Sequence, residues 1–213
     1  NTIRGNADKM HAREESMETK YFEGEMSKVT PIVNQEGSDS AMLDNTLEFL
    51  MMSGLELPLA VMILIPEPWM NNQSMSQKKR DFYEYHATMM EPWDGPASIL
   101  FSDGDIMGAV LDRNGLRPSR YYITNDDQLI LSSEVGVLDI PTSNIKVKER
   151  LRPGKMLLVD TVKGEVIDDE EIKEKYASKR PYGEWLDSNL VRLKDLKIPN
   201  IKVEEHGYEE RQR

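Results

Sequence analysis

The chain has 213 residues, with 27 Lys and Arg against 38 Asp and Glu, so its formal net charge is −11 at pH 7. It contains no cysteine, which excludes disulfides, cysteine-bound zinc or iron–sulfur clusters and a thiol nucleophile supplied by this chain. The acidic balance disfavours nucleic acid and anionic lipid surfaces as partners. Its longest apolar run, residues 57–65, is too short for a membrane span, and we expect a soluble segment.

The first part of the chain predicts helices. Residues 7 to about 26 are rich in Glu, Lys, Ala and Met and follow Asn6, a candidate N-cap, although their apolar stripe is thin. A second helix is expected after Ser40, because leucines recur at three- and four-residue spacing until Gly54 ends the pattern.

Two more helices are expected before the pattern changes. Residues 58–65 are too apolar for an amphipathic helix and predict one that is buried on several sides. Residues 76–90 predict a helix with Phe82, His86 and Met89 on one face, which Pro92 follows.

From residue 97 the apolar period becomes two, which predicts strands. Three turn signals separate them, at 103–104, 125–127 and 163–164. The expected hairpins pair residues 97–102 with 106–111, 120–124 with 128–132, and 155–160 with 165–167.

The chain ends with a short helix and a charged segment. Asp168 is expected to begin a helix that runs to about Tyr176. Residues 177–213 are charged, weakly periodic and contain two prolines, which predicts a linker or an arm. Helices followed by hairpins indicate an α+β fold, with antiparallel sheets covered on one face by helices.

No self-contained active site stands out from the residues. His11, His86 and His206 lie in three separate contexts, and local structural roles explain them better than a metal site. Paired aspartates at 103 and 105 and at 168 and 169 fit a turn and a helix start. The chain has no glycine-rich phosphate-binding motif, and we expect no metal.

Two loops are less ordinary. Residues 37–40, Gly-Ser-Asp-Ser, place hydroxyls around a carboxylate at a helix entrance, where an N-cap is the simpler interpretation. Arg113, Arg117 and Arg120 put three guanidinium groups into one inter-strand loop. Such a loop indicates either salt bridges to nearby acidic helices or an anionic ligand.

Long runs of sequence carry a family resemblance across nearly the whole chain. They include NTIRGN at 1–6, EGSDSAMLDN at 36–45, FYEYH at 82–86, MEPWDGPAS at 90–98, GAVLDRNGLRPSRY at 108–121 and LRPGKM at 151–156. In this order they resemble the class II glutamine amidotransferase domain of the large subunit of glutamate synthase. The resemblance covers much more of the chain than any single motif.

The resemblance implies an N-terminal-nucleophile hydrolase fold, an αββα sandwich of antiparallel sheets, which we expect to be incomplete here. In such domains an amino-terminal cysteine attacks the side-chain amide of glutamine through a thioester. An asparagine side chain and a glycine N–H form the oxyanion hole. Both groups are expected upstream of residue 1, so we expect no catalytic residue in this chain and no glutaminase activity from it alone.

Some binding residues transfer from the family by position. Asp39 matches the acidic residue that holds the α-ammonium of glutamine, and neighbouring Gly37 and Ser38 are candidates for the same pocket. Asn1 and Arg4 match a segment that supports the oxyanion hole. The three arginines Arg113, Arg117 and Arg120 match a family feature, for which a structural role or a domain contact is favoured over direct binding of substrate.

The resemblance also implies partners and cofactors. The parent enzyme would release ammonia from L-glutamine and use it to make glutamate from 2-oxoglutarate, with FMN, an iron–sulfur cluster and electrons from NADPH or ferredoxin. These cofactors belong to other domains, and none is expected in this chain. The expected partners are the remaining domains of the large subunit and a small electron-transfer subunit, in the cytoplasm.

The expected domain organisation follows from the same resemblance. Residues 1–176 would be the C-terminal part of the amidotransferase domain, and residues 177–213 a linker or arm toward the next domain. Two other hypotheses stay open: a non-catalytic amino-acid-binding module of the same fold, and an interaction segment whose acidic helices dock on neighbouring domains.

Overall fold

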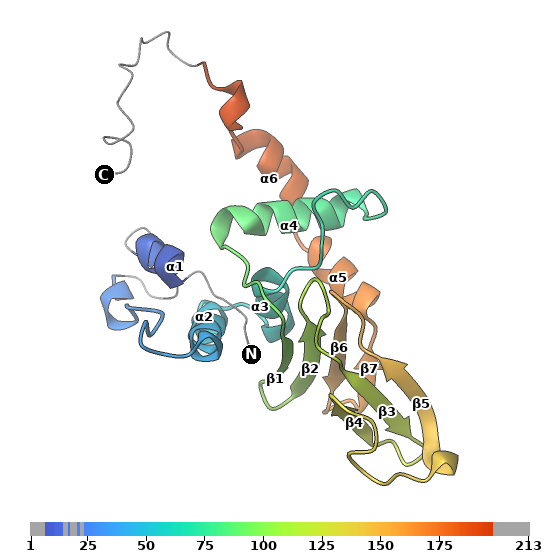
Figure 1. The fold of residues 1–213 in the computed structure, drawn as a ribbon. Helices are drawn as coiled ribbons and strands as arrows, with labels where there is room; N and C mark the ends of the chain where they lie inside the picture. Colours follow the sequence, from blue (N-terminus) through green and yellow to red (C-terminus); the bar gives the residue numbers. More distant parts are fainter. Residues whose placement is uncertain (1–6, 15–16, 18–20, 22–23, 198–213) are drawn as a thin grey trace, which may run out of the picture.

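The computed structural model describes residues 7–14, 17, 21 and 24–197 (Figure 1). Its α-helices are α1 (Ala7–Glu14), α2 (Asp39–Met52), α3 (Leu57–Leu64), α4 (Gln77–Met89), α5 (Asp169–Ala177) and α6 (Tyr182–Asn189). Its strands are β1 (Ser98–Ser102), β2 (Ile106–Leu111), β3 (Arg120–Thr124), β4 (Leu129–Ser132), β5 (Ile145–Arg150), β6 (Met156–Asp160) and β7 (Glu165–Ile167). Short 3-10 helices η2 (Met26–Lys28), η3 (Thr142–Asn144) and η4 (Leu193–Asp195) complete the described elements.

The strands form two antiparallel sheets. One sheet has the order β1-β2-β6-β7 and the other the order β4-β3-β5. The three expected hairpins are confirmed as β1–β2, β3–β4 and β6–β7. Two further antiparallel pairings, β2 with β6 and β3 with β5, join hairpins or strands that are distant in sequence. The α+β class is therefore confirmed.

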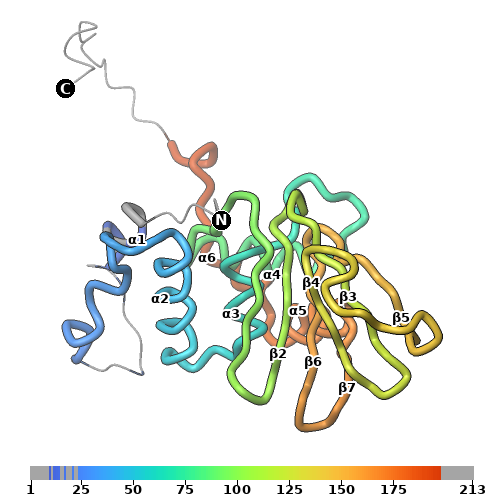
Figure 2. Tube along the Cα trace, turned by 60° about the horizontal axis from the view of Figure 1, so that its bottom comes forward, coloured from blue at the N-terminus to red at the C-terminus, as the bar shows by residue number. Residues whose placement is uncertain are grey.

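Alternate side chains of the four-stranded sheet enter two different cores. Val110, Met156 and Leu158 pack into the cluster beneath the helices. The alternating residues Ala109, Leu111 and Leu157 belong to a second cluster. Tyr121, Leu129 and Leu131 of the other sheet pack against this second cluster. The layers are therefore helices, then the four-stranded sheet, then the three-stranded sheet (Figure 2). A second helical layer is not present among the described residues, consistent with an incomplete sandwich.

Helix α3 is the centre of the helical layer. All eight of its residues are buried, which confirms the expectation from its uniformly apolar sequence, and Pro58 lies in its first turn, where a missing N–H costs nothing. Within the part of the chain that the structure describes, no helix has both the length and the apolar character required to cross a bilayer.

Side-chain caps explain where three other helices begin. The Oγ atoms of Ser38 and Ser76 accept hydrogen bonds from backbone N–H groups in the first turns of α2 and α4. Asp168 caps α5 in the same way through its carboxylate. These caps satisfy N–H groups that would otherwise lack a partner, so the sequence positions of Ser and Asp fix the helix starts.

The helix expected over residues 7–26 is wrong at Met17 and at residues 24–25, which the structure describes outside any helix, and residues 26–28 form the 3-10 helix η2. Helix α1 is described over Ala7–Glu14, and the Oε1 of Glu14 accepts a hydrogen bond from the N–H of Ile32 at 2.6 Å. Gly24 has φ +71°, a left-handed conformation that interrupts a helix. The candidate cap Asn6 lies outside the described residues. The placement of Met89 on the apolar face of α4 is also wrong, because it is 54% exposed.

Helix α6 lies in the segment that the sequence predicted as a linker or arm. The ring of Tyr182 lies 5.5 Å from that of Phe82 and 5.3 Å from that of His86, and Trp185 lies 5.2 Å from Tyr85. Two aromatic side chains thus hold α6 on α4 without a long apolar stripe. The domain boundary at residue 176 stays a prediction.

Candidate functional site

A groove of about 540 Å³ runs between α2 and strand β1. Strand β1 is an edge strand, paired with β2 alone among the described strands. The groove is lined from α2 by Ser40, Ala41, Leu43, Asp44 and Leu47, and from the sheet by residues 97–102. It therefore begins at the helix entrance that carries the Gly-Ser-Asp-Ser motif.

The chain is held in a defined turn as it enters α2. The side-chain carbonyl of Asn34 accepts from the N–H of Glu36, and its backbone carbonyl accepts from the N–H of Gly37. From within α2, the side chain of Asn45 accepts from the N–H of Asn34 at 3.2 Å. The Ser38 Oγ then caps the helix by accepting from the N–H of Ala41, so Ser38 has a structural role.

Gly37 is a glycine because the turn is tight. A Cβ atom at this position would lie 3.0 Å from the carbonyl oxygen of Asn34 and 3.4 Å from the Cβ of Ala41. The closer contact is to backbone, which cannot move aside like a flexible side chain. Gly37 thus sets the approach of the loop to the helix.

Asp39 occupies the first position of α2 and is half-buried. Among the described residues its carboxylate has no hydrogen-bond or salt-bridge partner. Helix α2 is 14 residues long, and the N–H groups at its start favour negative charge there. The arrangement leaves a carboxylate free to receive a cation beside the groove that begins at Ser40.

The arginine loop is organised by an aspartate that the sequence analysis did not single out. Asp112 is 2% exposed, and its carboxylate accepts from the N–H groups of Ala97, Asn114 and Gly115 at 3.0–3.1 Å. A short polar residue before Asn-Gly is a signal for this type of turn. Burial of the carboxylate depends on the tertiary structure.

The three arginines of this loop do not share one role. Arg113 forms a salt bridge with Asp94 at 2.7 Å, with both side chains 53% exposed. Arg117 and Arg120 are exposed and have no salt bridge with any described residue. None of the three lines the groove beside α2, so the structure does not bring them together with Asp39.

The remaining sequence candidates lie elsewhere. Asn1, Arg4 and His206 fall outside the described residues, and so does the side chain of His11. His86 is buried, its Nδ1 is 2.8 Å from the carbonyl oxygen of Phe82, and burial lowers its pKa, which confirms its local structural role. The described residues contain no group of three His, Cys, Asp or Glu side chains able to hold a metal ion.

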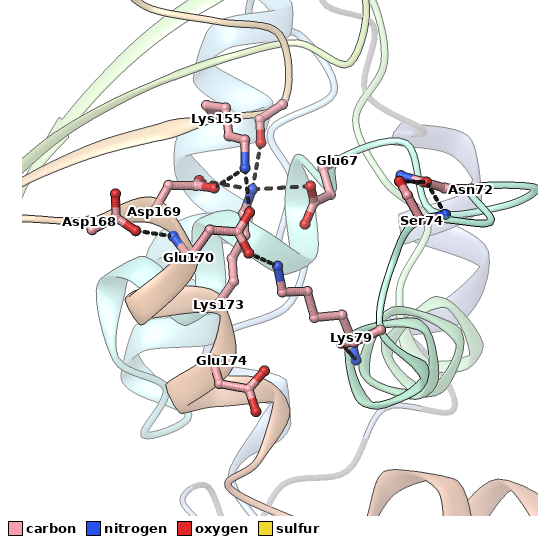
Figure 3. A network of polar contacts seen from close by, with 12 residues as sticks. Glu67, Asn72, Ser74, Lys79, Lys155, Asp168, Asp169, Glu170, Lys173 and Glu174 are labelled. Carbon is pink, nitrogen blue, oxygen red and sulfur yellow. Dashed lines mark hydrogen bonds and ion pairs between the residues drawn. The ribbon is translucent and has the colours of Figure 1, made fainter.

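A buried ion network joins α5 to the loop after α3 (Figure 3). The Nζ of Lys173 lies 2.8 Å from Asp169 and 3.3 Å from Glu67 and donates to the carbonyl oxygen of Gly154. Lys155 lies 2.8 Å from the other oxygen of Asp169. The network lies away from the groove and is structural, because every charge in it has a partner.

The periphery of this network is also strongly paired. Glu170 forms ion pairs with Lys155 and Lys79, and the hydrogen bond from Lys155 is the largest cause that lowers the pKa of Glu170 to about 2. Burial alone would lower the pKa of Lys155, but its bonds to Asp169 and Glu170 raise it overall. Both groups therefore stay charged near neutral pH.

The sequence of this chain is similar to those of known proteins. A family model described as "Glutamine amidotransferases class-II" matches residues 1–185. The chain is 52% identical over 91% of its length to a protein named glutamate synthase [NADPH] large chain from Bacillus subtilis (strain 168). It is 50% identical over 92% of its length to glutamate synthase [NADH] of Schizosaccharomyces pombe. It is 46% identical over 91% of its length to ferredoxin-dependent glutamate synthase 2, chloroplastic, of Arabidopsis thaliana.

These relatives are much longer than this chain. The matched region is 13% of the Bacillus protein, 9% of the Schizosaccharomyces protein and 12% of the Arabidopsis protein.

Proposed function

The chain belongs to the class-II glutamine amidotransferase family, and from this premise we propose that it forms part of the amidotransferase domain of a glutamate synthase. In that role it holds glutamine while the amide is hydrolysed, and the ammonia is used to make glutamate from 2-oxoglutarate. Identities of 46–52% to glutamate synthases of three kinds support this assignment.

Asp39 carries the proposal. Asp39 is half-buried, its carboxylate is unpartnered among the described residues, and it directly precedes Ser40, which lines the groove between α2 and β1. The α-ammonium group of glutamine is a compact cation that such a carboxylate binds by charge-assisted hydrogen bonds. Gly37 and Ser38 contribute by shaping the turn and capping the helix, which fixes the direction of Asp39.

The chemical step requires a group that this chain does not have. Family members use a cysteine thiolate as nucleophile, and the sequence contains no cysteine. We therefore expect the purified chain to release no ammonia from glutamine, and release above the level of a buffer blank would contradict this part of the proposal.

The redox cofactors are proposed to lie in other domains. An iron–sulfur cluster needs thiolate ligands, so a chain without cysteine does not fit one. FMN and the electron donor, for which the relatives' names give NADPH, NADH or ferredoxin, are likewise assigned to the rest of the parent enzyme. A small subunit and a cytoplasmic location stay predictions.

The test is the Asp39→Asn variant of the longer enzyme that contains this sequence. We expect the KM for glutamine to rise about a hundredfold, because an ammonium ion bound away from water loses its counter-charge, while kcat changes much less. The control is Glu48→Gln, which removes an exposed carboxylate of the same helix. An unchanged KM for Asp39→Asn would refute the role of Asp39.

Calorimetry distinguishes the alternative of a non-catalytic binding module. Glutamine binding to the isolated chain, lost in Asp39→Asn, would favour that module. A chain that holds only part of the pocket should show no heat of binding, and this is the result that we expect.

A further inference from the structure

The inference concerns one end of the three-stranded sheet, whose arginines do not line the groove beside α2. There, Arg120 at the start of β3 lies directly opposite Arg150 at the end of β5 and opposite Ser132 at the end of β4. Side chains directly opposite in antiparallel strands have Cβ atoms about 5 Å apart, and like charges in such pairs are destabilising. An arginine pair at this position indicates an anionic partner.

Two neighbouring arginines belong to the same end of the sheet. The N–H of Leu151 donates to the carbonyl oxygen of Ser119 at 3.0 Å, which extends the contact between the flanking loops. Gly115 touches Pro153, since a Cβ there would lie 2.4 Å from the Pro153 Cγ. Arg117 and Arg152 belong to these two touching loops, three residues before Arg120 and two residues after Arg150 in sequence. We call these four side chains the arginine patch.

The arginine patch is unusual within this acidic protein. Most described Lys and Arg side chains form a salt bridge, for example Arg13, Lys79 and Lys173. All four members of the patch are exposed, and none has a side-chain hydrogen bond or salt bridge with a described residue. Lys148, two residues before Arg150, adds a fifth charge and lies over the Tyr122 ring at 5.5 Å.

Nearby carboxylates do not neutralise the patch. Glu149 alternates to the other face of β5, where it lies opposite Tyr121 and raises the pKa of that hydroxyl after the larger effect of burial. Glu134 and Asp139, in the loop that follows β4, form no salt bridge with a described arginine. In a chain of net charge −11, the four guanidinium groups are thus a local concentration of unpaired positive charge.

Exposed apolar side chains accompany the patch. Leu116, next to Arg117, is 65% exposed. The loop that leaves the sheet at Ser132 exposes Val135, Val137 and Leu138 by 55–60%. Arginine is enriched at protein–protein interfaces, whose buried centres are more apolar than the rest of the surface, whereas nucleic-acid surfaces rely on a larger excess of positive charge.

We propose that the arginine patch is a docking surface for a carboxylate-rich segment of another polypeptide chain. The guanidinium groups pair with its carboxylates, and Leu116 and the loop after β4 contact its apolar side chains. This surface is independent of glutamine binding, so it holds whether or not Asp39 binds the α-ammonium group.

The test uses the complete 213-residue chain and a fluorescein-labelled peptide of alternating glutamate and leucine. Fluorescence anisotropy at low salt should show binding that weakens about tenfold or more in the Arg120→Glu, Arg150→Glu double variant. The matched control is Arg180→Glu with Lys194→Glu, which reverses two exposed charges elsewhere and should retain binding. Circular dichroism verifies that both variants are folded.

Four binding outcomes would overturn the proposal. They are equal peptide binding by the double variant and the chain, equal loss in the control variant, tighter binding of single-stranded DNA than of the peptide, and saturable competition by millimolar inorganic phosphate. Sedimentation tests whether a second copy of the chain occupies the surface. A dimer that the double variant abolishes would assign the surface to that second copy and would also overturn the proposal.

Discussion

The ammonium group of Lys173 lies 2.8 Å from the carboxylate of Asp169, one helical turn earlier in α5, and the two side chains are only 4% and 9% exposed. The pair is completed by Glu67 from the loop after α3 and by the carbonyl oxygen of Gly154. It connects the helical layer to the start of β6, where Asp169 also accepts from the N–H of Met156.

Replacing Lys173 by methionine should destabilise the protein by about 3 kcal/mol, because Asp169 and Glu67 would keep buried charge without their partner. Lys78→Met is the matched control, since Lys78 is 67% exposed and its salt bridge to Glu174 is 3.6 Å long, and it should cost less than about 1 kcal/mol. Urea denaturation measures both values. Similar losses in the two variants would contradict a special role for Lys173.

Asp112→Ala should destabilise the protein by about 3 kcal/mol, because three backbone N–H groups lose their acceptor in a buried site. Asp112→Asn retains one side-chain carbonyl oxygen as an acceptor and should lose less stability than Asp112→Ala. Hydrogen exchange gives the local readout: the amides of Ala97, Asn114 and Gly115 should exchange faster in the alanine variant. Unchanged protection of these amides would show that Asp112 does not hold the loop.

Gly115→Ala tests the contact between the two loops of the arginine patch. Gly115 has φ +59°, and an added Cβ would lie 2.4 Å from Pro153. Gly164→Ala is the control, because Gly164 has φ +68° and no atom within 4 Å of an added Cβ. The control variant should be less stable by about 1 kcal/mol because of backbone strain alone. Thermal denaturation should show a larger loss of stability for Gly115→Ala. Equal losses would mean that the loops separate at little cost.

Acid should weaken the contact between α3 and α5. The pKa of Glu56 is about 2 instead of 4.5, mainly because Lys179 donates to its carboxylate; Tyr176 and Lys175 contribute, against an opposing effect of burial. A lowered pKa in the folded state gives stability that is complete above pH 4.5 and is lost as the pH falls toward 2. The free energy of unfolding should therefore decrease across this range.

The Glu56→Gln variant isolates this contribution. It should be less stable than the original chain at pH 7, and its stability should depend less on pH between 4.5 and 2. Glu184→Gln, which changes an exposed carboxylate in α6, should leave the slope unchanged. Identical slopes in the Glu56 variant and the original chain would contradict the assignment.

Local chemistry in the sequence determined many elements of this fold. Ser38, Ser76 and Asp168 start helices because their side chains accept from first-turn N–H groups, and the turn signals at 103–104 and 163–164 close hairpins between neighbouring strands. The uniformly apolar α3 had to be buried. The motif around Asp39 identified the helix entrance beside the groove, because its residues are contiguous.

Only the tertiary structure decided the rest, since it depends on partners that are distant in sequence. Strand β5 and helix α6 were not predicted: β5 carries charges on its exposed face, and α6 is held by two aromatic side chains. A lysine in a charged helix predicts exposure, yet Lys173 is buried because Glu67 and Asp169 compensate its charge. The pairing of β3 with β5 likewise placed Arg120 opposite Arg150 in register, a like-charge pairing that local sequence patterns cannot encode.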